Sequence, residues 1–225
     1  MKIFLITVVC SLSLVLSADE LKSFPNSAKE TTGRTFTHNV QLTRNKVFLK
    51  GFRPITQKGS TCNIYTAIMI LRYYHYNMLP RDLKRGAQGH EYSSSNFIKK
   101  KLEKNGFDTL LLEPQNKLLF ASVIKKAIDN GIPVQWYVNL RLSPVAEERQ
   151  GDGHARVITG YVHNNSVLTE IIYADSWGRS KNMNKHMTIM SAYKMSDGLH
   201  LIFPKDLDKK TKKDLFSMRK TVAKR

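Results

Sequence analysis

Cys62 is the residue of this chain that most directly offers chemistry, because it is the only cysteine outside the first 18 residues. Gln57 lies shortly before it, and His154 and Asp175 follow it later in the chain. A thiol, an imidazole, a carboxylate and an amide are the groups that nucleophilic attack on a carbonyl uses. The four residues therefore predict a cysteine nucleophile with a base, an orienting carboxylate and an oxyanion donor.

Each of these groups needs a particular position. A free thiol has a pKa of roughly 8.5 and becomes a thiolate near neutral pH only beside a helix N-terminus or an imidazole. We expect Cys62 in the first turn of an apolar helix, at the positive end of the helix dipole. His154 should begin a strand across a cleft from that helix, and Asp175, after the next strand, should fix the imidazole tautomer. Gln57 and the Cys62 backbone N–H would then stabilise the oxyanion.

Structural roles stay open for the same residues. Cys62 also fits a buried cysteine that packs as a small hydrophobe. Gln57 also fits an ordinary loop glutamine. The combination of the four residue types, rather than any one of them, favours the catalytic interpretation.

Residues 1–18 have the pattern of an export signal. Lys2 precedes an apolar run from Ile3 to Leu16, and the small residues Ser17 and Ala18 follow it. The run is shorter than the roughly 20 apolar residues of a membrane span, which favours cleavage over anchoring. We therefore expect a secreted or periplasmic protein whose single remaining cysteine has no internal disulfide partner.

The rest of the chain divides by composition. Residues 19–45 form a polar lead-in, 46–204 fit one catalytic domain, and 205–225 form a basic tail. The tail holds nine Lys or Arg against three Asp, which predicts a solvated helix or a disordered segment.

Within the domain, hydrophobic spacing predicts helices first and strands later. Helical spacing covers residues 61 to about 80, 95–106 and 118–130. Runs rich in β-branched and aromatic residues predict strands at 133–139, 155–162, 168–174 and 199–203. This order is typical of an α+β fold, with a cleft between the helical layer and an antiparallel sheet.

Several of these strings resemble a known family. QKGSTC, GHARVITGY and ADSWG are similar to motifs of the papain-like cysteine peptidases, most closely the stand-alone C39-like group. LRYYHY and GIPV add to the resemblance, which covers residues 52–204. It implies a papain-like fold, with an N-terminal helical part packed on a C-terminal antiparallel β-sheet.

The resemblance also implies a role for each site residue. Cys62 would be the nucleophile, His154 the base and acid, Asp175 the orienting residue and Gln57 the oxyanion donor. Trp177 would cover the His154–Asp175 pair from water, although a core tryptophan is the other interpretation. The interval from Gln57 to Cys62 is one position shorter than the family's.

No other cofactor chemistry is indicated. The remaining histidines show no metal-ligand spacing, and the chain has neither a P-loop nor a GxGxxG after a strand. His186 lies close after Asp175 but lacks the strand context of His154. We predict no metal and no nucleotide cofactor.

The net charge is the second strong feature. A formal charge of +18 attracts polyanions. The other interpretation is that the charge only keeps the protein soluble. Without aromatic residues among the basic ones, specific nucleic-acid binding is not expected. The basic tail is instead predicted to adhere to an anionic surface.

The sequence therefore predicts an exported cysteine peptidase that hydrolyses a peptide or amide bond through a Cys-His-Asp triad and a thioacyl-enzyme. Two alternatives stay open. The same triad serves an acyltransferase or a transglutaminase-like enzyme, and the same fold serves a non-catalytic binding module with a basic surface.

Overall fold

The computed structural model describes residues 40–43, 45–89, 94–149, 152–177 and 185–222. The predicted export signal 1–18 and nearly all of the predicted lead-in lie outside the described residues.

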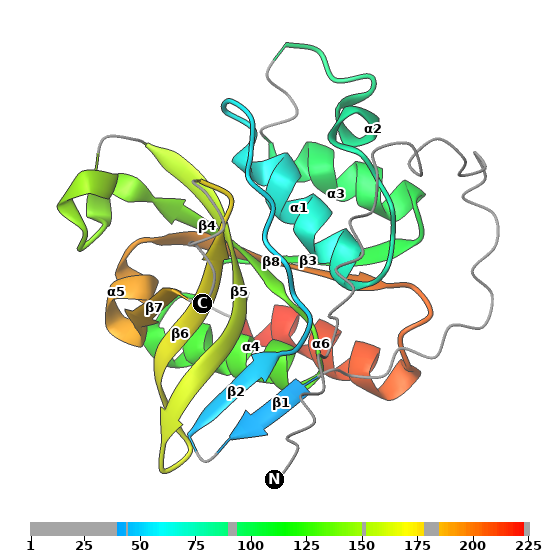
Figure 1. The fold of residues 1–225 in the computed structure, drawn as a ribbon. Helices are drawn as coiled ribbons and strands as arrows, with labels where there is room; N and C mark the ends of the chain where they lie inside the picture. The colour runs from blue at the N-terminus through cyan, green and yellow to red at the C-terminus, as the bar shows by residue number, and fades with distance from the viewer. Residues whose placement is uncertain (1–39, 44, 90–93, 150–151, 178–184, 223–225) are drawn as a thin grey trace, which may run out of the picture. The chain divides into compact units, whose positions relative to one another are not determined.

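An antiparallel sheet forms the centre of this described part (Figure 1). Its strands are β1 (Val40–Thr43), β2 (Lys46–Leu49), β3 (Phe107–Leu112), β4 (Val134–Asn139), β5 (Gly153–Asn164), β6 (Val167–Asp175), β7 (Lys185–Thr188) and β8 (Ser196–Pro204). The strand order is β1-β2-β5-β4-β8-β3, while β6 pairs with β5 and with β7. The long strand β5 thus pairs with β2, β4 and β6, and it carries His154 at its start.

Helices pack on both faces of the sheet. They are α1 (Cys62–Tyr73), α2 (Pro80–Lys84), α3 (Ser95–Lys104), α4 (Lys117–Asp129), α5 (Ile189–Lys194) and α6 (Lys209–Val222), with short 3₁₀ turns η3 (Leu140–Leu142) and η4 (Ala146–Glu148). Within the described residues, no helix has both the length and the apolar character that a membrane span requires.

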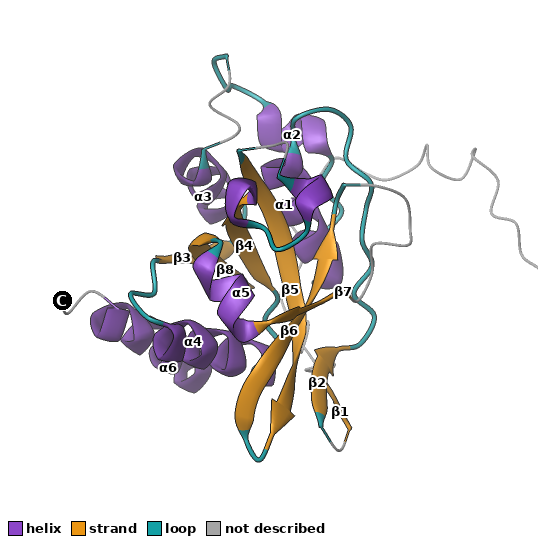
Figure 2. Ribbon diagram, turned by 90° about the vertical axis from the view of Figure 1, so that its left-hand side faces the viewer, coloured by secondary structure: helices purple, strands orange, loops and turns teal. Residues whose placement is uncertain are grey.

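The hydrophobic core divides at the sheet because side chains alternate between its faces. Val157 belongs to one buried cluster, together with Ile68 of α1 and Leu102 of α3. The next residue, Ile158, belongs to another, together with Ile124 of α4 and Leu215 of α6. The two views show α1 to α3 gathered together and α4 beside α6 elsewhere on the sheet (Figures 1 and 2).

These observations confirm the predicted α+β class, with helices on an antiparallel sheet. The predicted helices and strands occur with shifted ends. Helix α1 stops at Tyr73, short of the predicted limit near Pro80, because the chain turns at His75, whose φ is 62°, and Pro80 begins α2. The sequence patterns do not predict β1, β2, β3 or β7.

The basic tail forms a helix, one of the two predicted alternatives, but this helix is not fully solvated. Residues 209–222 form α6, whose Leu215 and Met218 are buried in the core cluster that contains α4. Lys209 and Lys213 are exposed on the same helix, and Lys212 forms an ion pair with Asp108 of β3. The composition suggests full solvation, but two apolar residues three positions apart are enough to dock one face of the helix.

We predict that Leu215→Ala lowers the free energy of unfolding by about 2–5 kcal/mol, because it leaves a cavity between α6 and the sheet. Urea denaturation measures this. Lys213→Ala, an exposed change on the same helix, should stay within about 0.5 kcal/mol of wild type. Equal stability of the two variants would contradict the docking of α6.

Candidate active site

Cys62 is the first residue of α1, as the helix pattern predicts. The loop before it is held locally, because Thr61 Oγ1 donates to the Lys58 carbonyl at 2.7 Å and Gly59 adopts a φ of 66°. Backbone N–H groups in the first turn of a helix have no intrahelical acceptor, so they and the helix dipole favour an anionic sulfur. The thiol itself is partly buried.

His154 and Asp175 meet across two neighbouring strands. Strand β5 carries His154, β6 ends at Asp175, and the two strands pair with Arg156 opposite Asp175. His154 Nε2 lies 2.7 Å from Asp175 Oδ1, and both side chains are only 3% exposed. Because Asp175 is an acceptor, Nε2 carries the hydrogen of this bond and Nδ1 is the ring nitrogen left for Cys62.

The pKa shifts of Asp175, His154 and Cys62 each favour the charged form of the group. Burial raises the Asp175 pKa, but hydrogen bonding and the charges of His154 and Arg156 outweigh it and bring the pKa to about 2. Burial lowers the His154 pKa, but Asp175 and Cys62 outweigh it and raise the pKa to about 9. Burial also raises the Cys62 pKa, while His154 and the backbone N–H groups of Ala155 and Asn63 lower it, with a net decrease. These shifts favour a thiolate–imidazolium pair at neutral pH.

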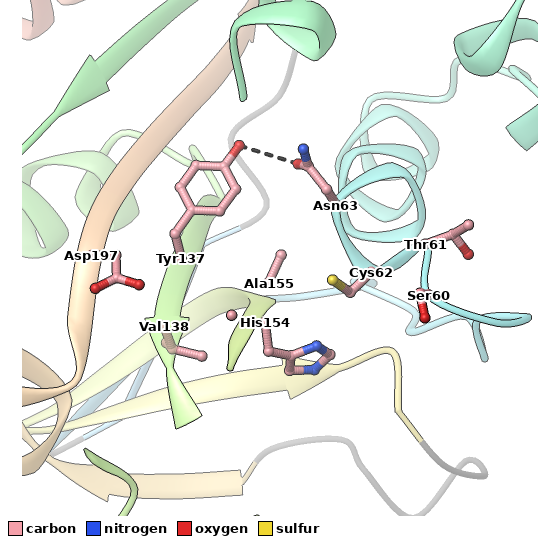
Figure 3. Close-up of a pocket in the computed structure, with 10 residues that line it drawn as sticks. Ser60, Thr61, Cys62, Asn63, Tyr137, Val138, His154, Ala155 and Asp197 are labelled. Carbon is pink, nitrogen blue, oxygen red and sulfur yellow. Dashed lines mark hydrogen bonds between the residues drawn. The ribbon is translucent and has the colours of Figure 1, made fainter. Parts of the chain in front are cut away.

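A cavity of about 270 Å³ opens at Cys62 and His154 (Figure 3). Small-molecule pockets span roughly 300–1,000 Å³, so this one has room for a side chain or a short segment of substrate. The other residues that line it are Ser60, Thr61, Asn63, Tyr137, Val138, Gly153, Ala155 and Asp197.

Gln57 lies near the triad but does not line this cavity. Its backbone N–H donates to the Ser176 carbonyl at 2.8 Å, and its Oε1 accepts from Ser176 Oγ at 2.5 Å. Its Nε2 donates to the Gly59 carbonyl at 2.7 Å. The structure therefore brings Cys62, His154 and Asp175 together, whereas the amide proposed as oxyanion donor is bonded to Gly59 of its own loop and to Ser176 after β6.

Trp177 lies against the histidine. Its ring centroid is 5.0 Å from that of His154, and its backbone N–H donates to Asp175 Oδ1 at 2.8 Å. The indole is 49% exposed, so it covers one face of the imidazole and is not a core tryptophan. His186 lies on β7 and pairs with Glu170, away from the residues that line the cavity.

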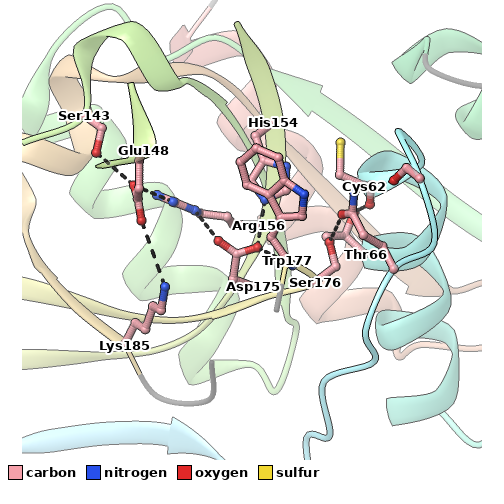
Figure 4. A network of polar contacts seen from close by, with 12 residues as sticks. Cys62, Thr66, Ser143, Glu148, His154, Arg156, Asp175, Ser176, Trp177 and Lys185 are labelled. Carbon is pink, nitrogen blue, oxygen red and sulfur yellow. Dashed lines mark hydrogen bonds and ion pairs between the residues drawn. The ribbon is translucent and has the colours of Figure 1, made fainter. Parts of the chain in front are cut away.

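Arg156 was not predicted from the sequence as a site residue. It contacts the Asp175 carboxylate at the oxygen that does not face His154 (Figure 4). Its Nε donates to Asp175 Oδ2 at 2.9 Å, and its Nη2 lies 2.6 Å from Glu148 Oε2. The guanidinium is 1% exposed and sits 4.9 Å from the Tyr173 ring centroid. One signal for it was present in the sequence: Arg156 is a charged residue inside an apolar strand run, two positions after His154. A buried arginine is almost always paired, so this position indicates an arginine with a carboxylate partner.

A second buried network holds the start of α1 against the sheet. Gln135 of β4 donates from Nε2 to Asn63 Oδ1 at 2.8 Å and to Thr66 Oγ1 at 2.7 Å. The Tyr137 hydroxyl donates to Asn63 Oδ1 at 3.2 Å. His200 lies 2.9 Å from Gln135 Oε1 through Nδ1, and burial lowers its pKa to about 3. This neutral network fixes the helix that carries Cys62 relative to the strand beside His154.

Several solved structures are similar to this chain. The peptidase domain of Streptococcus ComA, a bi-functional ABC transporter involved in a quorum sensing pathway, is 16% identical. That match covers 68% of this chain and 98% of that domain, with a TM-score of 0.49. A double glycine motif protease from an AMS/PCAT transporter, in complex with the leader peptide, is 12% identical. That match covers 72% of this chain and 99% of the protease chain, with a TM-score of 0.48.

A third similar structure is the N-terminal peptidase C39 like domain of a toxin secretion ATP-binding protein from Vibrio parahaemolyticus. It is 10% identical, with 65% of this chain and 99% of that one covered and a TM-score of 0.42. No curated protein matches this chain. The model of the Peptidase_C39 like family matches residues 49–197, a range that contains Cys62, His154 and Asp175. The resemblance predicted from the sequence motifs is confirmed, and the chain belongs to the Peptidase_C39 like family.

Proposed function

We propose that this protein is an exported cysteine peptidase that hydrolyses a peptide or amide bond through Cys62, His154 and Asp175. The observation that carries the proposal is the buried 2.7 Å contact between His154 Nε2 and Asp175 Oδ1, with Cys62 at the start of α1 in the same cavity. Family membership supports peptidase chemistry, and the composition of residues 1–18 supports export.

The steps of the proposed reaction depend on the negative charge of the Cys62 thiolate and the positive charge of the His154 imidazolium. The Cys62 thiolate attacks the substrate carbonyl carbon, and the carbonyl oxygen becomes an oxyanion beside the N-terminus of α1. As the C–N bond breaks, the His154 imidazolium gives its proton to the leaving amine and a thioester remains on Cys62. The neutral imidazole then takes a proton from water, which attacks the thioester and releases a carboxylic acid and the thiolate. Asp175 holds the ring throughout and stabilises its charged form.

Gln57 does not line the cavity, and its Nε2 donates to the Gly59 carbonyl. Donation to the oxyanion therefore requires its amide to turn toward the cavity. The Cys62 backbone N–H, in the first turn of α1, needs no such movement. We therefore assign the larger share of oxyanion stabilisation to the backbone.

The first prediction concerns the thiolate. Iodoacetamide should alkylate Cys62 rapidly below roughly pH 8, because His154 lowers the thiol pKa. His154→Ala should return the labelling to an ordinary thiol profile, while His186→Ala, a change at the surface histidine on β7, should behave as wild type. Mass spectrometry after timed labelling measures both. Slow labelling of wild type with an ordinary profile would instead favour the non-catalytic binding module.

Hydrolysis of a peptide library should have a narrower pH range than labelling. As the pH rises through about 9, His154 loses its proton while the thiolate remains. Alkylation should therefore persist and hydrolysis should fall, since the leaving amine no longer receives a proton. Adding a primary amine to the same assay separates hydrolysis from acyl transfer, because a transferase would yield the new amide.

A further prediction concerns Arg156. Arg156→Met leaves the Asp175 and Glu148 carboxylates buried without their shared cation, which should lower the free energy of unfolding by about 3–5 kcal/mol. Arg141→Met removes an exposed ion pair with Asp152 and should cost about 1 kcal/mol or less. Urea denaturation compares the two. A loss at Arg156 no larger than that at Arg141 would contradict a supporting role for this arginine.

We also infer that α6 contributes to adhesion on an anionic surface. Lys209 and Lys213 are exposed, on the helix whose opposite side is buried. Deleting residues 205–225 would not test this, because it would remove Leu215 and Met218 from the core. Charge substitution on the exposed face avoids that problem.

The double variant Lys209→Gln, Lys213→Gln should bind phosphatidylglycerol vesicles about thirtyfold more weakly than wild type, since each lysine contributes roughly 1 kcal/mol at an anionic membrane. Lys100→Gln, Lys104→Gln is the matched control, with two exposed lysines at the same spacing on α3. Vesicle sedimentation measures both. Equal weakening would point to the overall charge and against a role specific to α6.

A further inference from the structure

The cavity at Cys62 contains a carboxylate that the proposed mechanism does not use. Asp197 lines this cavity from β8, on the side where Tyr137 and Val138 of β4 also lie (Figure 3). Among the described residues that line the cavity, it is the one carboxylate, and none of them is a lysine or an arginine.

A β-bulge places Asp197 there. Across the β4–β8 pairing, Tyr137 is opposite Gly198 and Val138 is opposite Ser196. Asp197 is therefore the extra residue of β8, with no partner on β4. A bulge of this kind redirects a side chain that a regular ladder would place by strict alternation, and bulges are frequent beside active sites.

Asp197 also lacks a compensating charge. Asp152, close to the same cavity, pairs with Arg141, and Asp129 pairs with Lys125. No ion pair or hydrogen bond to the Asp197 carboxylate occurs within the described residues, although the chain has 36 Lys and Arg against 18 Asp and Glu. Burial raises its pKa, as expected for a carboxyl group without a cation beside it.

We propose that Asp197 determines specificity by binding a cationic group of the substrate, a lysine or arginine side chain or an amine, in the cavity beside Cys62. This inference rests on the proposed function. The thiolate and the His154 imidazolium form a pair without net charge, so Asp197 carries the net charge among the described residues that line the cavity and attracts a cationic group there. Asp197 is exposed to solvent, which limits the preference to about three- to tenfold.

The test uses three alkyl methanethiosulfonates: aminoethyl (cationic), propyl (neutral, with the same number of non-hydrogen atoms as aminoethyl) and sulfonatoethyl (anionic). The Cys62 thiolate attacks the sulfenyl sulfur of the reagent, forming a mixed disulfide and releasing methanesulfinate. The ratio of cationic to anionic labelling rates should fall about three- to tenfold in Asp197→Asn and further in Asp197→Lys. Asp152→Asn is the matched control, because it removes one carboxylate that is 77% exposed and does not line the cavity, so solvent screens its charge and the ratio should change much less than in Asp197→Asn.

The labelling ratio and the absolute rate report on different claims. An unchanged ratio in Asp197→Asn overturns the role of Asp197, whatever the absolute rate. Slow labelling of wild type by the neutral reagent overturns the activated thiolate instead, and a ratio that still responds to Asp197 leaves the cation preference standing. The wild-type ratio should also decrease at high salt, which tests the electrostatic origin without any substitution.

Discussion

The candidate site depends on a carboxylate that is buried and still ionised. Isolated, such a group would be costly to remove from water and would become protonated. Asp175 avoids this because both of its oxygens are satisfied: Oδ1 by His154 and the Trp177 backbone N–H, and Oδ2 by Arg156. The pairing of β5 with β6, which sets Arg156 opposite Asp175, is therefore a requirement of the chemistry as well as of the fold.

Burying Arg156 in turn requires its own partners. Glu148 supplies a second carboxylate, held by Ser143 Oγ at 2.8 Å, and the Tyr173 ring covers the guanidinium. Arginine suits this place because its rigid fork reaches two carboxylates at once, whereas lysine is a point charge. The segment around η4 thus belongs to the electrostatics of the triad, although it contributes no residue to the cavity.

The sequence predicted the parts that local patterns encode. The start of α1, the extent of α4 and the strands that bear His154 and Asp175 follow from apolar spacing and strand composition. Features that depend on pairing between distant segments were not predictable in this way. The Arg156–Glu148 contact and the bulge at Asp197 exist only once β5, β8 and η4 are assembled. A helix was one of the two alternatives predicted for the tail, but its docking was not predicted, because its many lysines outweigh Leu215 and Met218 in composition.

Gln57 holds the loop before the first helix through both ends of its side-chain amide. The loop before α1 turns at Gly59, and both ends of the Gln57 amide are engaged, Oε1 by Ser176 and Nε2 by the Gly59 carbonyl. Through Ser176, the residue after Asp175, Gln57 ties the loop that precedes the nucleophile to the end of the strand that orients the histidine. This tie uses Oε1 and the backbone N–H of Gln57, while Nε2 donates to Gly59, and Gln57 does not line the cavity at Cys62. These contacts favour Gln57 as a positioning residue in the proposed mechanism, with the backbone N–H groups at the start of α1 as the main oxyanion donors.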